Sequence, residues 1–97
     1  MKTQRSSGNV YRDLGFSPEE AENLRARSDL MIELTKLIKA RHLTQAAAAK
    51  WLRVTQPRIS DLMRGKIDRF STDNLIEMLG HAGLRVGFIL KPRRKVA

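Results

Sequence analysis

The stretch from residue 44 to residue 65 constrains the fold most, because it encodes two short helices in close succession. Thr44 and Thr55 each precede a helical run, and threonine is a favoured residue at a helix N-cap. The first run, residues 45–52, is rich in alanine, which has the highest helix propensity and allows close helix packing. The second run ends at Gly65, a residue typical of helix C-termini. Two helices this short bury little surface alone, so we expect further helices behind them.

Helices are predicted on both sides of this pair. Ser17-Pro18-Glu19-Glu20 combines a cap, a proline for the first turn and a capping box, and helical apolar spacing then continues, which predicts a helix over about residues 18–41. Ser71 or Thr72 begins another helix that ends near Gly83. Together with the central pair, these segments predict an all-α bundle of four to five helices.

Residues 84–90 have the two-residue periodicity of a strand with one apolar face. An isolated strand leaves its backbone donors and acceptors unpaired, so we expect it to pair with its own copy across a twofold axis. There are two alternatives: the segment is an extended tail packed on the helices, or it is a strand that pairs with a different protein. The predicted dimer interface consists of Leu84, Val86, Phe88 and Leu90.

The two ends of the chain are predicted to differ from the domain between them, residues 17–91. Residues 1–16 form a polar arm, flexible because it has few apolar groups to bury. Residues 92–97 form a basic tail. The arm ends in an apolar cluster that could contact the domain or a partner protein, namely Val10, Tyr11, Leu14 and Phe16.

The formal net charge of +9 is unevenly distributed along the chain. Residues 41–70 carry 7 basic and 2 acidic side chains, whereas residues 1–40 carry 7 and 6. A cationic excess in a segment with its own motif favours phosphate binding, with an anionic membrane or an acidic protein as alternatives. We therefore expect double-stranded DNA as the partner. The basic tail, residues 92–97, either touches the DNA backbone or is a solvated end.

The helix that begins at Gln56 carries side chains suited to reading DNA. Gln56 can bond adenine, Arg58 can bond guanine and Asp61 can accept from cytosine, all in the major groove. Residues at helix starts, and just past the Gly65 stop, are better placed for phosphates. The predicted DNA-binding residues are Gln45, Thr55, Gln56, Pro57, Arg58, Ser60, Asp61, Arg64 and Lys66.

Other classes of function find little support. There is no cysteine, no phosphate-cradling glycine loop and no histidine beside a plausible nucleophile, so we expect no enzyme. Glu77 and His81 lack a third ligand, so we expect neither a metal nor another cofactor. Trp51 is expected in the core or an interface. No signal peptide or long apolar segment is visible, which favours the cytoplasm.

Residues 44–65 resemble the helix-turn-helix of the xenobiotic-response-element (XRE) family of bacterial and phage regulators, which includes the lambdoid repressors. The resemblance implies a lambda-repressor-like fold and the base and phosphate contacts given above. Arg53 departs from the pattern, because the family usually has glycine there in a left-handed turn, and a non-glycine residue costs on the order of 1 kcal/mol. The matching residues are Gln45, Ala49, Leu52, Val54, Thr55, Gln56, Ile59, Leu62 and Gly65.

The similarity extends beyond the motif, to residues 9–16 and to Gly65-Lys66 and Phe70-Ser71. This wider arrangement resembles the HigA-type subgroup of antitoxins. It implies a transcriptional repressor that autorepresses its operon and neutralises a small RelE-like ribonuclease toxin of a type II toxin-antitoxin pair. A stand-alone regulator without a toxin partner has the same architecture and is the alternative.

Overall fold

Hydrogen-bonded caps begin the four longer helices, as the sequence predicts. The Ser17 hydroxyl accepts a hydrogen bond from the Glu20 amide, and the Glu20 carboxylate accepts one from the Ser17 amide. The Thr44, Thr55 and Ser71 hydroxyls each accept from the amide three residues later. The computed structural model describes residues 9–92, which form α1 (Val10–Asp13), α2 (Pro18–Ala40), α3 (Gln45–Leu52), α4 (Gln56–Met63), the 3₁₀ turn η1 (Ile67–Arg69) and α5 (Thr72–His81).

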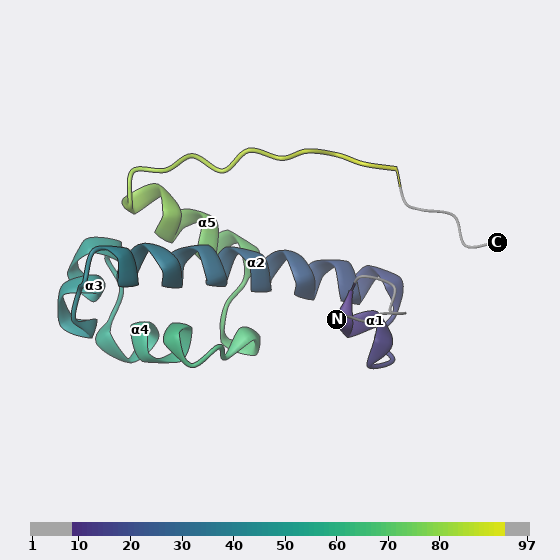
Figure 1. The fold of residues 1–97 in the computed structure, drawn as a ribbon, viewed down its shortest axis with the longest axis horizontal. Coiled ribbons are helices and arrows are strands. Elements are labelled where there is room, and N and C mark those ends of the chain that lie inside the picture. Colours follow the sequence, from purple (N-terminus) through teal and green to yellow (C-terminus); the bar gives the residue numbers. More distant parts are fainter. Residues whose placement is uncertain (1–8, 93–97) are drawn as a thin grey trace.

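Helix α2 is the axis of the fold. In Figure 1, α3 and α4 lie near its C-terminal half, α5 packs on its other side, and α1 lies near its N-terminal end. Apolar side chains from α2, α3, α4 and α5 meet in one core and hold the two short helices in place. No helix among residues 9–92 has the length and apolar character needed to cross a membrane. The core comprises Met31, Leu34, Ile38, Ala48, Ala49, Leu52, Ile59, Leu62, Phe70, Leu75, Met78 and Leu79.

The turn between α3 and α4 has the same left-handed backbone as the glycine-containing turns that it resembles. Arg53 has φ 59° and ψ 45°, a region that side chains with a Cβ atom rarely adopt. The following amide, of Val54, donates to the Ala49 carbonyl at 3.0 Å, which closes the end of α3. The chain therefore keeps the turn geometry despite the missing glycine.

The predicted C-terminal strand is absent from the described residues. Beyond α5 the chain runs extended, back toward the N-terminal end of α2, without the ladder that defines a strand (Figure 1). Alternating apolar residues specify only a face, whereas a strand also needs a partner, and no other segment of residues 9–92 supplies one. Val86 is half-buried against the core, whereas Leu84 is 48%, Phe88 72% and Leu90 92% exposed. The structure therefore does not support the predicted strand or its pairing across a dimer.

Part of the predicted N-terminal arm is folded. Asn9 is buried, and its amide nitrogen donates to the Ala21 carbonyl at 3.0 Å, while its side-chain oxygen accepts from the Tyr11 amide. These bonds tie the short helix α1 to α2. Residues 1–8 of the predicted arm, and most of the predicted basic tail, lie outside the described residues.

Candidate nucleic-acid interface

Helix α4 presents one face to the core and one to solvent. Ile59 and Leu62 are fully buried against α3 and the helices behind it. The first turn is open, with Gln56 and Pro57 both exposed, and Arg64 is exposed at the far end. Ser60 and Asp61 lie between these two ends of the helix and are half-buried. One side of α4 thus faces solvent, and we call it the outward ridge. It carries Gln56, Pro57, Ser60, Asp61 and Arg64, whereas Arg58 lies outside it.

Arg58 is folded back toward α5. Its guanidinium lies over the Phe70 ring, 4.2 Å from the ring centre, and also donates to the Arg69 carbonyl and, at 3.4 Å, to the Asn74 side-chain oxygen. The side chain thereby connects α4 to η1 and α5. Its binding to guanine stays a prediction.

Asp61 has an ion-pair partner that was not predicted from the sequence. The Arg69 guanidinium donates to the Asp61 carboxylate at 3.3 Å. The Asp61 side chain is 17% exposed and the Arg69 side chain 53%. The sequence carries no local signal for this pair, because Asp61 and Arg69 are eight positions apart and lie in different elements.

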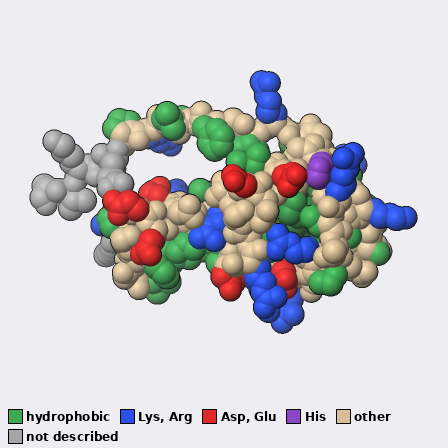
Figure 2. Space-filling view, turned by 180° about the vertical axis from the view of Figure 1, so that it is seen from behind, with side chains coloured by type: hydrophobic (Ala, Val, Ile, Leu, Met, Phe, Trp, Pro, Cys, Tyr) green, Lys and Arg blue, Asp and Glu red, His purple; other side chains and the backbone are tan. Residues whose placement is uncertain are grey.

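The residues predicted to bind phosphates lie at the starts of α3 and α4 and after α4. Gln45 is exposed at the first position of α3, and Lys66 is half-buried in the turn before η1. The Thr55 hydroxyl already accepts from the Arg58 amide as a cap, which leaves its hydrogen available to donate. Lys and Arg side chains gather beside Asp and Glu at the lower margin of the molecule in Figure 2.

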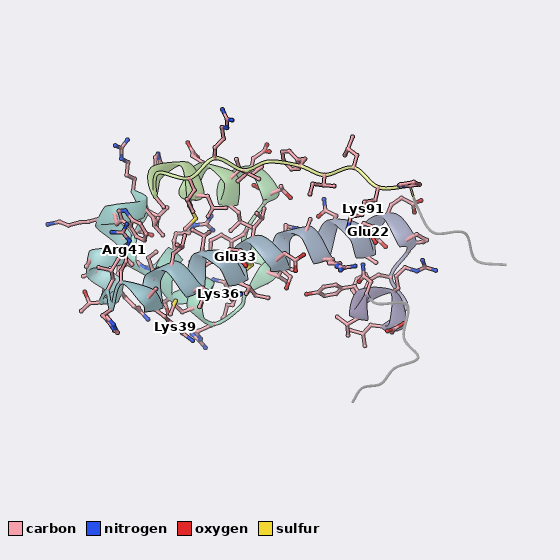
Figure 3. The ribbon with its side chains drawn as sticks, turned by 45° about the horizontal axis from the view of Figure 1, so that its top comes forward. Glu22, Glu33, Lys36, Lys39, Arg41 and Lys91 are labelled. Atoms are coloured by element: carbon pink, nitrogen blue, oxygen red, sulfur yellow. The ribbon has the colours of Figure 1, made fainter. Side chains whose placement is uncertain are left out.

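Charged side chains also line α2, where Lys36 and Lys39 border a hollow that α4 helps to form. Glu33, Lys36 and Lys39 project from it in Figure 3, and Lys36 pairs with Glu33 at 3.5 Å. Arg41, just past its C-terminus, lies over the Trp51 ring at 4.4 Å from the ring centre. Trp51 is half-buried and packs against the core, and one face of its ring is covered by this arginine.

The cluster predicted to bind a partner is exposed at the opposite end of α2 from α3. Val10, Leu14 and Phe16 are all exposed on or just after α1, and Tyr11 is half-buried. The Tyr11 and Phe16 rings meet edge to face, with 6.2 Å between their centres. The structure brings the four side chains together on a single short segment near the N-terminal end of α2 (Figure 1), and Tyr11 lines a hollow that Leu62 and Met63 of α4 also line.

The fold presents two short helices, α3 and α4, packed on further helices, and α4 has an exposed polar side. This arrangement defines a helix-turn-helix DNA-binding protein. The family model described as "Helix-turn-helix domain" matches residues 10–89. A solved structure assigned to the XRE family of transcriptional regulators is 32% identical and has a TM-score of 0.71. The match covers 80% of this chain and 90% of that one. No curated protein matches.

The chain therefore belongs to the XRE-like helix-turn-helix family, and it is a DNA-binding transcriptional regulator. The sequence correctly predicted this family and the all-helical bundle.

Proposed function

We propose that the protein is a sequence-specific repressor that inserts the first turns of α4 into the major groove of operator DNA. The observation that carries this proposal is the exposure of Gln56 and Pro57 at the start of α4, while Ile59 and Leu62 on its other face are buried. A helix in the major groove reads bases with residues near its N-terminus. The exposed Gln45 at the start of α3 would hold a phosphate beside the groove.

We further propose that two copies act together as a homodimer. A single α4 covers only a few base pairs, whereas two helices about 34 Å apart reach successive major grooves of a palindromic operator. The exposed apolar segment that contains Phe88 and Leu90 supports this proposal. In Figure 2 it arches over the body with open space beneath, so its own chain covers it little. The cytoplasm, where operator DNA is accessible, would be the place of action, and we propose no catalytic activity.

The finer proposal is that the repressor is the antitoxin of a type II pair. The apolar cluster of Val10, Tyr11, Leu14 and Phe16 would contact a small RelE-like ribonuclease toxin. The cluster lies at the N-terminal end of α2 and the exposed first turn of α4 lies near the C-terminal end, which would let the protein bind toxin and operator at the same time. A stand-alone regulator is the second candidate, because the helix-turn-helix needs no toxin to bind DNA.

The DNA proposal is tested with two matched glutamine variants. We expect Gln56→Ala to lose roughly 1–3 kcal/mol of binding to the operator and much less with random duplex, because the lost bond is to a base. Gln45→Ala should weaken both duplexes alike, because it removes a phosphate contact. Fluorescence anisotropy with DNA from the protein's own promoter measures both. Failure of the unaltered protein to bind that DNA at low salt would contradict the proposal.

The antitoxin proposal is tested with the product of the neighbouring open reading frame. If that product is a small ribonuclease, we expect it to form a complex with this chain that Leu14→Asp abolishes, because a charge is placed at the apolar contact. Arg12→Ala, on the same short helix, should leave the complex intact, and both variants should still bind operator. The absence of such a neighbour, or of any complex, would favour the stand-alone regulator.

A further inference from the structure

Arginines from two helices fix the turn that follows the recognition helix. Arg27 of α2 donates to the carbonyls of Ile67 and Phe70, at 3.3 and 3.1 Å. Arg58 of α4 donates to the carbonyl between them, that of Arg69. Hydrogen bonds that involve a charged donor are stronger than those between neutral groups. The backbone of η1 is therefore held in one position relative to α4.

The Arg69 side chain extends from this fixed turn to the edge of the outward ridge of α4. Asp61, its partner at 3.3 Å, lies one helical turn from both Pro57 and Arg64, which are exposed. The ion pair uses only part of the guanidinium, which has five donors. More than half of the Arg69 side chain is open to solvent. A cation is thus held beside the helix that enters the groove.

We propose that Arg69 binds a DNA phosphate at the wall of the major groove away from α3, and that Asp61 and Arg58 are positioning residues for it. The proposal rests on the proposed insertion of α4. Asp61 orients the guanidinium and Arg58 holds the Arg69 backbone. Without a cation beside it, the Asp61 carboxylate would repel the phosphates. The protein then contacts phosphates on both sides of the groove, through the start of α3 on one side and through η1 on the other.

The salt dependence of binding to operator and to random duplex tests the phosphate contact. Because a phosphate contact carries no sequence information, Arg69→Ala should weaken both duplexes alike, on the order of tenfold at low salt. The slope of log affinity against log salt should fall by about one. Arg69→Lys should keep the slope, because the charge remains, but recover only part of the affinity. Arg12→Ala, which removes an exposed cation from the distant α1, should change neither quantity.

A second measurement separates positioning from base reading by Asp61. If Asp61 acts through Arg69, Asp61→Asn leaves the order of preference among operator variants unchanged, because it removes no base contact. A changed preference at one base pair would instead assign Asp61 to cytosine and overturn its positioning role.

Thermal melting controls for folding, and we expect Arg69→Ala to melt close to the unaltered protein because the ion pair is largely exposed. If Arg69→Ala matched Arg12→Ala in slope and affinity while the unaltered protein bound its operator, the phosphate contact would be refuted. If the unaltered protein itself failed to bind DNA, the proposed function would be refuted.

Discussion

Arg58 is expected to stabilise the fold as well as the recognition surface, and Arg58→Ala measures how much. The guanidinium lies 4.2 Å from the centre of the buried Phe70 ring, a contact worth about 1 kcal/mol in a half-buried setting. Its bond to the Arg69 carbonyl contributes about 1 kcal/mol more. Arg27 still holds the neighbouring carbonyls, so η1 should not unfold as a whole. The sum is a loss of about 2 kcal/mol of unfolding free energy.

For a domain of this size that loss lowers the melting temperature by roughly 8–15 °C. Calorimetry or circular dichroism would measure the shift, with Arg64→Ala as the matched control, because Arg64 is exposed at the end of the same helix. Arg64→Ala should change the unfolding free energy by less than about 0.5 kcal/mol. If Arg58→Ala melted within about 2 °C of that control, the stabilising role argued from the stacking would be wrong. A selective loss of operator preference would then assign Arg58 to guanine alone.

Three further substitutions test other parts of the molecule. Arg53→Gly should raise the unfolding free energy by about 0.5 kcal/mol, because relief of the left-handed backbone outweighs the added freedom of the unfolded chain; a lower melting temperature would contradict this. Phe88→Asp should convert a dimer into monomers in light scattering, whereas Ile89→Asp, on the alternate face, should not; equal behaviour would contradict pairing by that face. Asn9→Ala should cost about 1–2 kcal/mol in thermal unfolding, since the Ala21 carbonyl loses a buried donor; an unchanged melting temperature would contradict it.

Helix boundaries were predictable because their causes are local. Ser17, Thr44, Thr55 and Ser71 cap amides only three residues away, so the sequence contains both members of each bond. The resemblance to turns that contain glycine indicates a left-handed backbone at this turn, but the sequence left open whether Arg53 keeps that backbone or remodels the turn, and the structure shows that it keeps it.

The C-terminal segment could not be predicted in the same way. Alternation in residues 84–90 indicates one apolar face, and the half-burial of Val86 agrees with it. Whether such a segment becomes a strand depends on a second backbone, which local pattern does not encode. Leu90, 92% exposed, shows how little of that face the chain's own helices cover. The prediction of a strand therefore assumed a second backbone, which no other segment of residues 9–92 supplies.

The internal partners of individual residues on α4 were the least predictable, and the reason is geometric. Side chains on the flank of a recognition helix can face the groove or the next turn of the protein, and arginine and aspartate suit both surroundings. The path of the chain after Gly65 decides between them. Gly65, with φ 71°, turns the backbone after α4. The burial of Phe70 then brings η1 against the side of α4 that carries Arg58 and Asp61. Two residues that look like base readers in the sequence thereby acquire internal partners, while more than half of the Arg69 side chain stays open to solvent.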